Sequence, residues 1–378
     1  MIYLDYAADT PPDDGVIKTF SAAAREFYAN ANSAHALGVN SLNRFNEALL
    51  SIKNRLLGVA EADGYELIAV SSASEANNLA VKGIAEAYRG GGKHIVSTVL
   101  EHPSVGGALT YLQAKGWEVD LVRIGRDGKV DTEHMKSLVR QDTVLVSVCA
   151  VDSELGTVQP VEGIARILRE FPDCRFHTDA TQLIGKIPLP PIDGVCALTF
   201  APHKFYGLGG AAFLLKEKKT VLTPLIHGGG VSAFRSGTPA VALAVAAEKA
   251  VALALDGLNA RYAYVSALRS KLAAAVRVLP GAHINSPENG VPHILNFGFD
   301  GVRGESLREA LSETGVCVSV KSACSVNNTP SKAVYAVTGD KKRALSSIRV
   351  SISHLTTEAE TDIFMEKLES ALRRIKTL

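Results

Sequence analysis

The chain has 378 residues, with 40 Lys and Arg against 39 Asp and Glu, so its formal net charge is +1. Hydrophobic residues make up 47% and charged residues 21%, the balance of an ordinary globular protein, which excludes disordered and collagen-like classes. With a near-neutral charge and no Lys/Arg-rich run, we expect no binding to nucleic acid or to an anionic membrane surface.

The five cysteines indicate a reducing environment, and the apolar stretches indicate neither a signal peptide nor a membrane span. The cysteines form no C-x-x-C pair, and their odd number leaves one over in any disulfide scheme, so we expect reduced thiols in a cytoplasmic protein. The first residues have no basic or apolar region typical of a signal peptide. The longest apolar stretch, residues 240–255, contains Glu248 and Lys249, so we expect no membrane span.

The first two thirds of the chain alternate between short apolar runs and amphipathic stretches. Strands are expected at residues 67–70, 94–98, 119–124, 144–149 and 195–200. Between the first two, apolar residues from Ala76 to Ala87 repeat at helical spacing. This alternation predicts an α/β fold with a mostly parallel sheet that helices flank.

The last third of the chain changes character. A long helix is expected from about Pro239 to Leu258, with further helix to about Val278, followed by strand-like segments at 294–299, 317–320 and 348–352. We therefore predict a large cofactor-binding domain at 13–255 and a smaller α+β domain at 256–378, with residues 1–12 packed on the smaller one.

Several chemically reactive side chains follow predicted strands, where parallel sheets bind their ligands. The segment from Ser71 to Asn77 has the capping-box spacing Ser72 to Glu75, and Ser74 adds a hydroxyl beside free backbone N–H groups. That arrangement suits a phosphate group, although a plain helix cap is the alternative.

His102, Asp179 and Lys204 follow three further strand-like segments. Each has an ordinary explanation, as a surface histidine, a helix cap or one of many cations, but together with a phosphate site they match the needs of pyridoxal phosphate. The lysine would hold the cofactor through its amine, and the aspartate would keep the pyridine nitrogen protonated. The chain has no P-loop, nucleophile elbow, H-E-x-x-H or G-x-G-x-x-G motif, and we expect no metal site.

At these residues the chain resembles the cysteine desulfurases, in the class V aminotransferase group of fold-type I pyridoxal phosphate enzymes. The resemblance runs nearly end to end, and its motifs occur in the family's order. They are Tyr3-Leu-Asp-Tyr-Ala-Ala8, Asn32-Ser-Ala-His-Ala-Leu-Gly38, Ala73-Ser-Glu-Ala-Asn-Asn78, Glu101-His102, Asp179-Ala-Thr-Gln182, His203-Lys-Phe-Tyr-Gly207, Arg235-Ser-Gly-Thr238, Ser322-Ala-Cys324 and Thr356-Thr-Glu358.

The resemblance implies a role for each matching residue. Lys204 would hold the cofactor, His102 would stack on its ring and assist proton transfer, and Cys324 would take sulfur from a substrate cysteine as a persulfide, leaving alanine. The cofactor would be bound by Ala73, Ser74, His102, Ser153, Asp179, Gln182, His203, Lys204 and Thr238, the last reaching from the neighbouring subunit of a homodimer. Asn32 and His354 would contact the amino-acid substrate, and a sulfur-acceptor protein would be a further partner.

Some positions depart from the family pattern. The family's S-x-G-R motif, whose arginine grips the substrate carboxylate, reads Ser351-Ile-Ser-His354 here, and a neutral histidine is a weaker partner for a carboxylate. Ser153 stands where the family has Asn, and Ala201 replaces a serine. Arg349 and Arg235 are the alternatives for the missing arginine.

The leading hypothesis is pyridoxal phosphate-dependent cleavage of the C–S bond of L-cysteine or a related amino acid. The change at His354 favours either an altered substrate or weaker activity. The alternatives are an aminotransferase or other lyase of the same superfamily, for which Cys324 is incidental, and a weakly active relative that serves as a sulfur-transfer partner.

Overall fold

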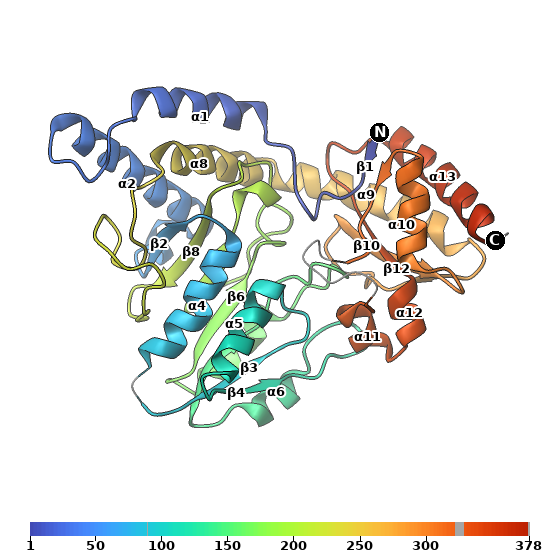
Figure 1. Ribbon diagram of the computed structural model, residues 1–378, viewed down its shortest axis with the longest axis horizontal. Coiled ribbons are helices and arrows are strands. Elements are labelled where there is room, and N and C mark those ends of the chain that lie inside the picture. The colour runs from blue at the N-terminus through green and yellow to red at the C-terminus, as the bar shows by residue number, and fades with distance from the viewer. Residues whose placement is uncertain (89, 322–328, 377–378) are drawn as a thin grey trace.

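The computed structural model describes residues 1–88, 90–321 and 329–376, and the described residues have an α/β fold with a seven-stranded, a three-stranded and a two-stranded sheet. Figure 1 shows the larger group of elements on the left and a smaller group, which includes both chain ends, on the right. In the part of the chain that is described, no helix is long and apolar enough to cross a membrane.

The larger sheet has seven strands in the order β2-β8-β7-β6-β5-β3-β4. All neighbours run parallel except β8, which is antiparallel to both β2 and β7, so the predicted mostly parallel sheet is confirmed. The strands are β2 (Tyr65–Val70), β3 (His94–Ser97), β4 (Glu118–Leu121), β5 (Thr143–Ser147), β6 (Arg175–Asp179), β7 (Ala197–Phe200) and β8 (Ala212–Glu217).

Helices cover both faces of this sheet, because successive strand residues point to opposite sides. Leu67 packs in one hydrophobic cluster with α7 and α8, while its neighbour Ile68 packs in another with α4 and α5. The helices of this part are α1 (Asp14–Glu26), α2 (Ala36–Leu57), α3 (Val59–Ala62), α4 (Ala73–Ala87), α5 (Pro103–Gln113), α6 (Thr132–Leu138), α7 (Val161–Leu168) and α8 (Val241–Asp256), with the 3-10 turn η1 (Pro202–Lys204).

The smaller sheet is antiparallel, in the order β12-β10-β9, and has its own hydrophobic cluster. The N-terminal strand β1 pairs with β11, and Leu4 lies in the same cluster. The elements are β1 (Ile2–Tyr3), α9 (Leu258–Arg277), β9 (Ala282–Ile284), β10 (Ile294–Phe299), α10 (Gly304–Glu313), β11 (Val316–Cys317), α11 (Lys332–Thr338), α12 (Lys341–Ser346), β12 (Ser347–Ser351) and α13 (Glu358–Lys376).

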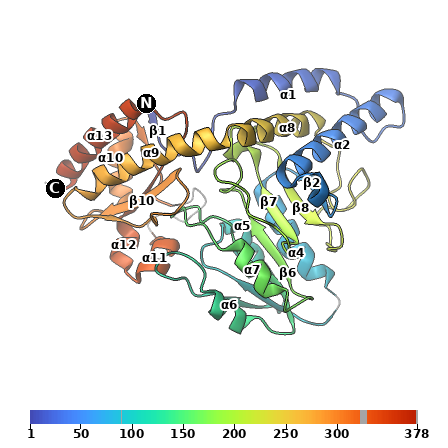
Figure 2. The same ribbon diagram turned by 180° about the vertical axis from the view of Figure 1, so that it is seen from behind.

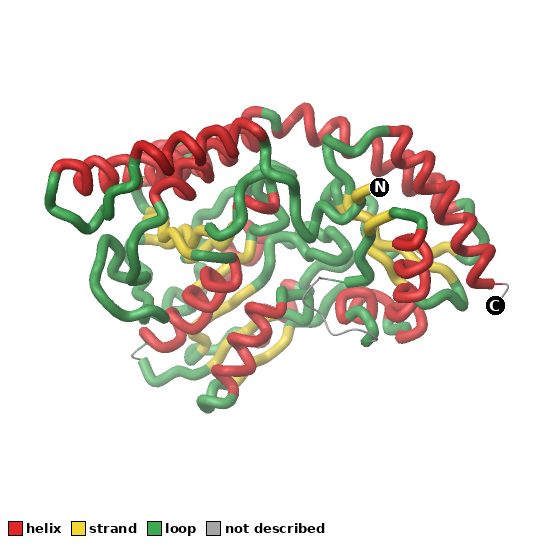
Figure 3. Tube along the Cα trace, turned by 45° about the horizontal axis from the view of Figure 1, so that its top comes forward, coloured by secondary structure: helices red, strands yellow, loops and turns green. Residues whose placement is uncertain are grey.

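Two helices in line connect the two groups of elements. The long helix predicted from Pro239 is α8, which ends at the cap residue Gly257, and α9 follows directly. Figure 2 shows the two helices as one nearly continuous rod, and Figure 3 shows helices lying over the strands of the larger sheet. The domain limits at residues 13, 255 and 256 stay a prediction.

Candidate active site

A cavity of about 320 Å³ lies at the carboxyl ends of the parallel strands, the position expected for a ligand site in this class of fold. It is lined by segments that follow β2, β3, β5, β6 and β7 and by the N-terminal segment. The predicted residues that line it are Ala73, Ser74, His102, Ser153, Asp179, Gln182, His203 and Lys204.

Lys204 ends the short turn η1 that follows β7. Burial lowers the pKa of its amine, and the nearby positive charge of Arg349 lowers it further. The amine donates hydrogen bonds to the carbonyl oxygens of Ala7, at 3.1 Å, and Ala8. A larger fraction of this lysine is therefore neutral than of an exposed one, and the neutral amine is the form that attacks a carbonyl carbon.

Asp179 is the last residue of β6, and its side chain is held from two directions. Its Oδ2 accepts a hydrogen bond from Nδ2 of Asn77 at 2.7 Å, and its Oδ1 accepts one from the backbone N–H of Thr181 at 2.9 Å. These donors are neutral, so the carboxylate keeps its charge available for a protonated ring nitrogen. Thr181 Oγ1, also at the cavity wall, is buried and has no hydrogen-bond partner in the described chain.

His102 is the N-cap of α5, and its ring orientation follows from that position. Its Nδ1 accepts a hydrogen bond from the backbone N–H of Ser104 at 3.1 Å, so the neutral ring carries its proton on Nε2. Asn77 also donates to Oγ of Ser104 at 2.9 Å, and this hydroxyl lies 2.8 Å from Nδ1 of His102. Ser104 and Asn77 therefore link His102 to Asp179. Burial lowers the pKa of His102, while the charge of Asp179 opposes that shift.

The first turn of α4 forms the opposite end of the cavity. Its cap residue Ser72 accepts from the N–H of Glu75 at 3.2 Å, as the capping box predicts. The N–H groups of Ala73 and Ser74 have no partner within the helix and, with the helix dipole, favour an anion such as a phosphate. Glu75 in turn accepts a hydrogen bond from Nε of Arg235 at 3.1 Å.

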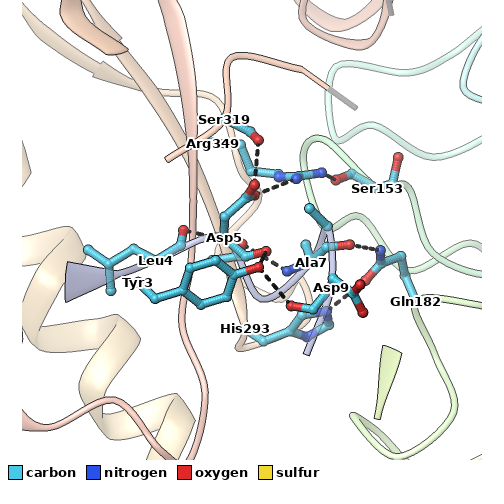
Figure 4. Close-up of polar contacts among 12 residues, drawn as sticks. Tyr3, Leu4, Asp5, Ala7, Asp9, Ser153, Gln182, His293, Ser319 and Arg349 are labelled. Atoms are coloured by element: carbon cyan, nitrogen blue, oxygen red, sulfur yellow. Dashed lines mark hydrogen bonds and ion pairs between the residues drawn. The ribbon is translucent and has the colours of Figure 1, made fainter. Parts of the chain in front are cut away.

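Gln182 connects the cavity to the N-terminal segment and to the smaller group of elements. Its Nε2 donates to the carbonyl oxygen of Ala7 at 2.8 Å, and its Oε1 lies 3.2 Å from Nε2 of His293 (Figure 4). One of the two amide N–H groups of Gln182 is thus used by Ala7, and the other is free for a ligand.

Arg349, on β12, is the residue whose importance the sequence understated. It is 1% exposed and lines the same cavity. Its guanidinium lies between two acceptors, Oδ1 of Asp5 at 2.8 Å and the carbonyl oxygen of Ser153 at 2.9 Å (Figure 4). Its Nε is buried without a partner in the described chain. The cavity therefore has a permanent cation with one donor to spare.

Three predicted site residues that the structure describes do not line this cavity. His354 lines a separate, smaller cavity, where its ring contacts Tyr206 edge-on at 4.5 Å between centroids. Thr238 lines a groove beside α2, and Asn32 is exposed, close to where a Cβ on Gly230 would lie. Cys324 lies outside the described residues. Of Arg349 and His354, Arg349 lines the cavity with Lys204 and His354 lines the smaller cavity.

Comparisons with known proteins agree with this site. The family model of class-V aminotransferases matches residues 2–364. The chain belongs to this family. Cysteine desulfurase IscS of Dictyoglomus turgidum is 33% identical, with 100% of this chain and 96% of the relative aligned. The mitochondrial cysteine desulfurase of Arabidopsis thaliana is 36% identical over 100% of this chain and 83% of the relative.

Solved structures give the same result for the fold. A NifS-like protein superposes with a TM-score of 0.91 at 34% identity, covering 98% of this chain and 99% of that one. SspA in complex with cysteine superposes with a TM-score of 0.80 at 28% identity, covering 93% and 99%. The predicted resemblance to cysteine desulfurases is confirmed, as is the fold-type I architecture of a pyridoxal phosphate-dependent enzyme.

The cavity fits this cofactor. It combines a buried amine at Lys204, a fixed carboxylate at Asp179, a ring with a known tautomer at His102 and a helix N-terminus for the phosphate. Thr181 and Arg349 at its wall each carry a buried polar atom, Oγ1 and Nε, that has no partner among the described residues.

Proposed function

We propose that this protein cleaves the C–S bond of L-cysteine or a closely related amino acid, transferring the sulfur to Cys324 and releasing alanine. The observation that carries the proposal is that Lys204, Asp179 and His102 line one cavity together with Arg349, a cation suited to an amino-acid carboxylate. Relatives named cysteine desulfurase, aligned over the whole chain, support the substrate class.

The residues that would hold pyridoxal phosphate are those at the cavity wall. Lys204 would bind it covalently, Asp179 would contact the ring nitrogen, Gln182 the phenolic oxygen, and Ala73, Ser74 and His203 the phosphate. When bound, this cofactor draws electrons away from the substrate Cα, so that bonds next to that carbon break more easily.

The chain's own side chains do the remaining work. Arg349 orients the substrate through its carboxylate, and Nε2 of His102 carries the proton that the reaction needs on the cavity side. The balance is simple: cysteine and the Cys324 thiol give alanine and a persulfide, with no external oxidant or reductant. A thiolate at Cys324 is the attacking form.

The test follows the cofactor and the products separately. Purified holoprotein should show a visible absorption band that L-cysteine perturbs and that Lys204→Ala abolishes. Mixing with L-cysteine and a thiol reductant should yield equal amounts of alanine and sulfide, and Cys324→Ala should stop both while keeping the band. Keto-acid formation that Cys324→Ala leaves intact would instead establish an aminotransferase, and an unresponsive band would establish a protein without this activity.

We also propose that the protein works as a homodimer. Thr238 and Asn32 are exposed and lie away from their own cavity, and apolar side chains of the neighbouring helices are also exposed. If Thr238 serves the partner's site, mixing Thr238→Ala with Lys204→Ala subunits should restore one intact site per mixed dimer. No restoration would show that Thr238 acts within its own subunit or not at all.

The remaining proposals concern location and partners. The described cysteines Cys149, Cys174, Cys196 and Cys317 are all free thiols, which supports a reducing compartment such as the cytoplasm. A persulfide on Cys324 would need an acceptor, and we propose a sulfur-acceptor protein for that step. Radiolabelled sulfur retained on Cys324 until a cell extract is added would test it, and release without extract would argue against a protein acceptor.

A further inference from the structure

A second, much smaller cavity is lined by Tyr206, which does not line the candidate active site. Its volume is about 20 Å³, which is room for one water-sized particle. It is formed where the segments after β6, η1 and β12 meet α9 and the start of β10. Four basic side chains line it, namely Lys186, Arg261, His293 and His354.

These basic groups have no negative partner at the cavity. Within the described residues no Asp or Glu lines it, and the carboxylate that acts on His354 is Asp13, at the start of α1. Lys186 is only 8% exposed, and its amine faces the Tyr206 ring, 5.6 Å from the ring centre. Nη1 of Arg261 and Nδ1 of His293 are buried without partners.

The basic groups surround the ring of Tyr206. Nζ of Lys186 lies 5.6 Å and the guanidinium carbon of Arg261 5.3 Å from the ring centre, and the His354 ring lies 4.5 Å away. The Tyr206 hydroxyl is already bonded to Oγ of Ser353 at 2.6 Å. A ring face attracts cations weakly, so it cannot replace a counter-ion for the protonated amine of Lys186 beside the guanidinium of Arg261.

We propose that this cavity binds a small monovalent anion of the halide class, such as chloride, between Lys186, Arg261 and His354. A volume for one water-sized particle suits a single-atom anion better than sulfate, phosphate or a carboxylate, each of which has several heavy atoms. The amine of Lys186, which lines the cavity, and the unpartnered Nη1 of Arg261 supply the donors that a buried anion needs. This site is distinct from the cofactor cavity and does not depend on the proposed function.

Anion binding at this site is linked to proton uptake. Burial lowers the pKa of Lys186 to about 7, with Lys204 and Arg261 adding to the shift, and that of His354 to about 4. Burial lowers the pKa of His293, with Lys186, Arg349 and Arg269 adding to the shift, and Asp13 opposes the shift at His354. An anion favours the protonated forms, so its affinity should rise as the pH falls through the pKa of Lys186.

The orientation of His293 supports this linkage. Because Nε2 of Gln182 donates to Ala7, its Oε1 must accept from Nε2 of His293, and Nδ1 of the neutral ring is then a bare acceptor. Nδ1 becomes a donor toward an anion only after it gains a proton. The alternative to a bound anion is an uncharged site, in which a water molecule fills the cavity and Lys186 is deprotonated.

The test compares thermal unfolding of the holoprotein in sodium chloride, sodium bromide and sodium gluconate at one ionic strength. Gluconate is too large for the cavity. At a chloride concentration ten times the dissociation constant, the midpoint should rise by roughly 2 °C over gluconate. The rise should be larger at about pH 6 than at about pH 8.5, and Lys186→Met and Arg261→Gln should each remove it.

Two exposed residues of α1, changed as Lys18→Met and Arg25→Gln, provide matched controls that should keep the full rise. Equal midpoints in chloride and gluconate, or an equal rise in wild type, Lys186→Met and Arg261→Gln, would overturn the proposal. If a cavity variant fails to fold, broadening of the chloride NMR signal by wild-type protein, reversed by bromide, tests the site without any substitution. The proposal is overturned if the broadening does not exceed that of gluconate-equilibrated controls.

Discussion

Replacing Arg349 with glutamine separates what this arginine does for stability from what it does for substrate binding. Arg349 is buried, and its ion pair with Asp5 is 2.8 Å long, with the Asp5 side chain 19% exposed. Breaking a buried pair from one side costs about 3–5 kcal/mol because the other charge stays unpaired. Here Ser319 still donates to Asp5 at 2.8 Å, so we expect the lower part of that range.

The decrease in kcat/KM should be separate from the loss of stability and larger than that loss can account for. The loss of a charge-assisted contact to the substrate carboxylate in a closed site costs about 2–5 kcal/mol of binding energy. This corresponds to a roughly 30- to several-thousand-fold decrease in kcat/KM. Urea unfolding measures the first effect, and alanine formation from L-cysteine measures the second. The exposed Arg166→Gln, where the side chain is 68% exposed, is the control and should change neither.

The double variant Asp5→Asn with Arg349→Gln provides the discriminating result. Removing both charges leaves no unpaired carboxylate, so the free energy of unfolding should return to within about 1 kcal/mol of wild type. The kcat/KM should stay low, because the cation is still missing. Recovery of kcat/KM together with stability would refute a direct role of Arg349 in substrate binding and leave it as a structural residue.

Three further substitutions have expected outcomes. Burial raises the pKa of Glu101 from 4.5 to about 8, so the free energy of unfolding falls as the pH rises between these values. Glu101→Gln has no such group to titrate and should reduce this fall by on the order of 4 kcal/mol. Urea unfolding at about pH 4.5 and about pH 8 measures the difference. Asn77→Ala removes a donor to both Asp179 and Ser104 and should weaken cofactor binding to the apoprotein roughly 5- to 150-fold, measured by titration. His354→Arg should leave the KM for L-cysteine unchanged while increasing the chloride-dependent rise in unfolding temperature, and a lowered KM would contradict this placement.

Most of the larger sheet could be predicted from the sequence because its strands are short runs of β-branched residues between turns. Strand β8 was missed, since Lys216 interrupts its apolar run. The structure shows why a lysine is tolerated there, because its buried amine donates to the carbonyl oxygen of Thr220 at 2.7 Å. The strand predicted at 119–124 ends at Leu121, and Ile124 forms only an isolated bridge with Val130.

The site was predictable where it depends on strand ends and not where it depends on distant segments. Lys204, Asp179 and His102 each follow a strand of one sheet, so topology alone brings them together. Arg349 comes from the other sheet, and no local pattern shows which cavity it enters. The available signal was a single charged residue within the apolar run of β12, which a half-buried strand rarely contains without a partner.

Tyr206 lines the smaller cavity with His354, and the two cavities share no lining residue, so a change at position 354 can leave the active site intact. The backbone of Tyr206 has φ of 70°, an unusual value for a residue with a side chain, two positions after Lys204. The N-terminal segment fixes it there, since Oγ1 of Thr10 accepts from its N–H at 2.7 Å and its carbonyl oxygen accepts from Asp13 N–H at 2.8 Å. Its ring contacts His354, with 4.5 Å between the ring centres. The charge at position 354 can therefore vary without changing any residue that lines the cofactor cavity.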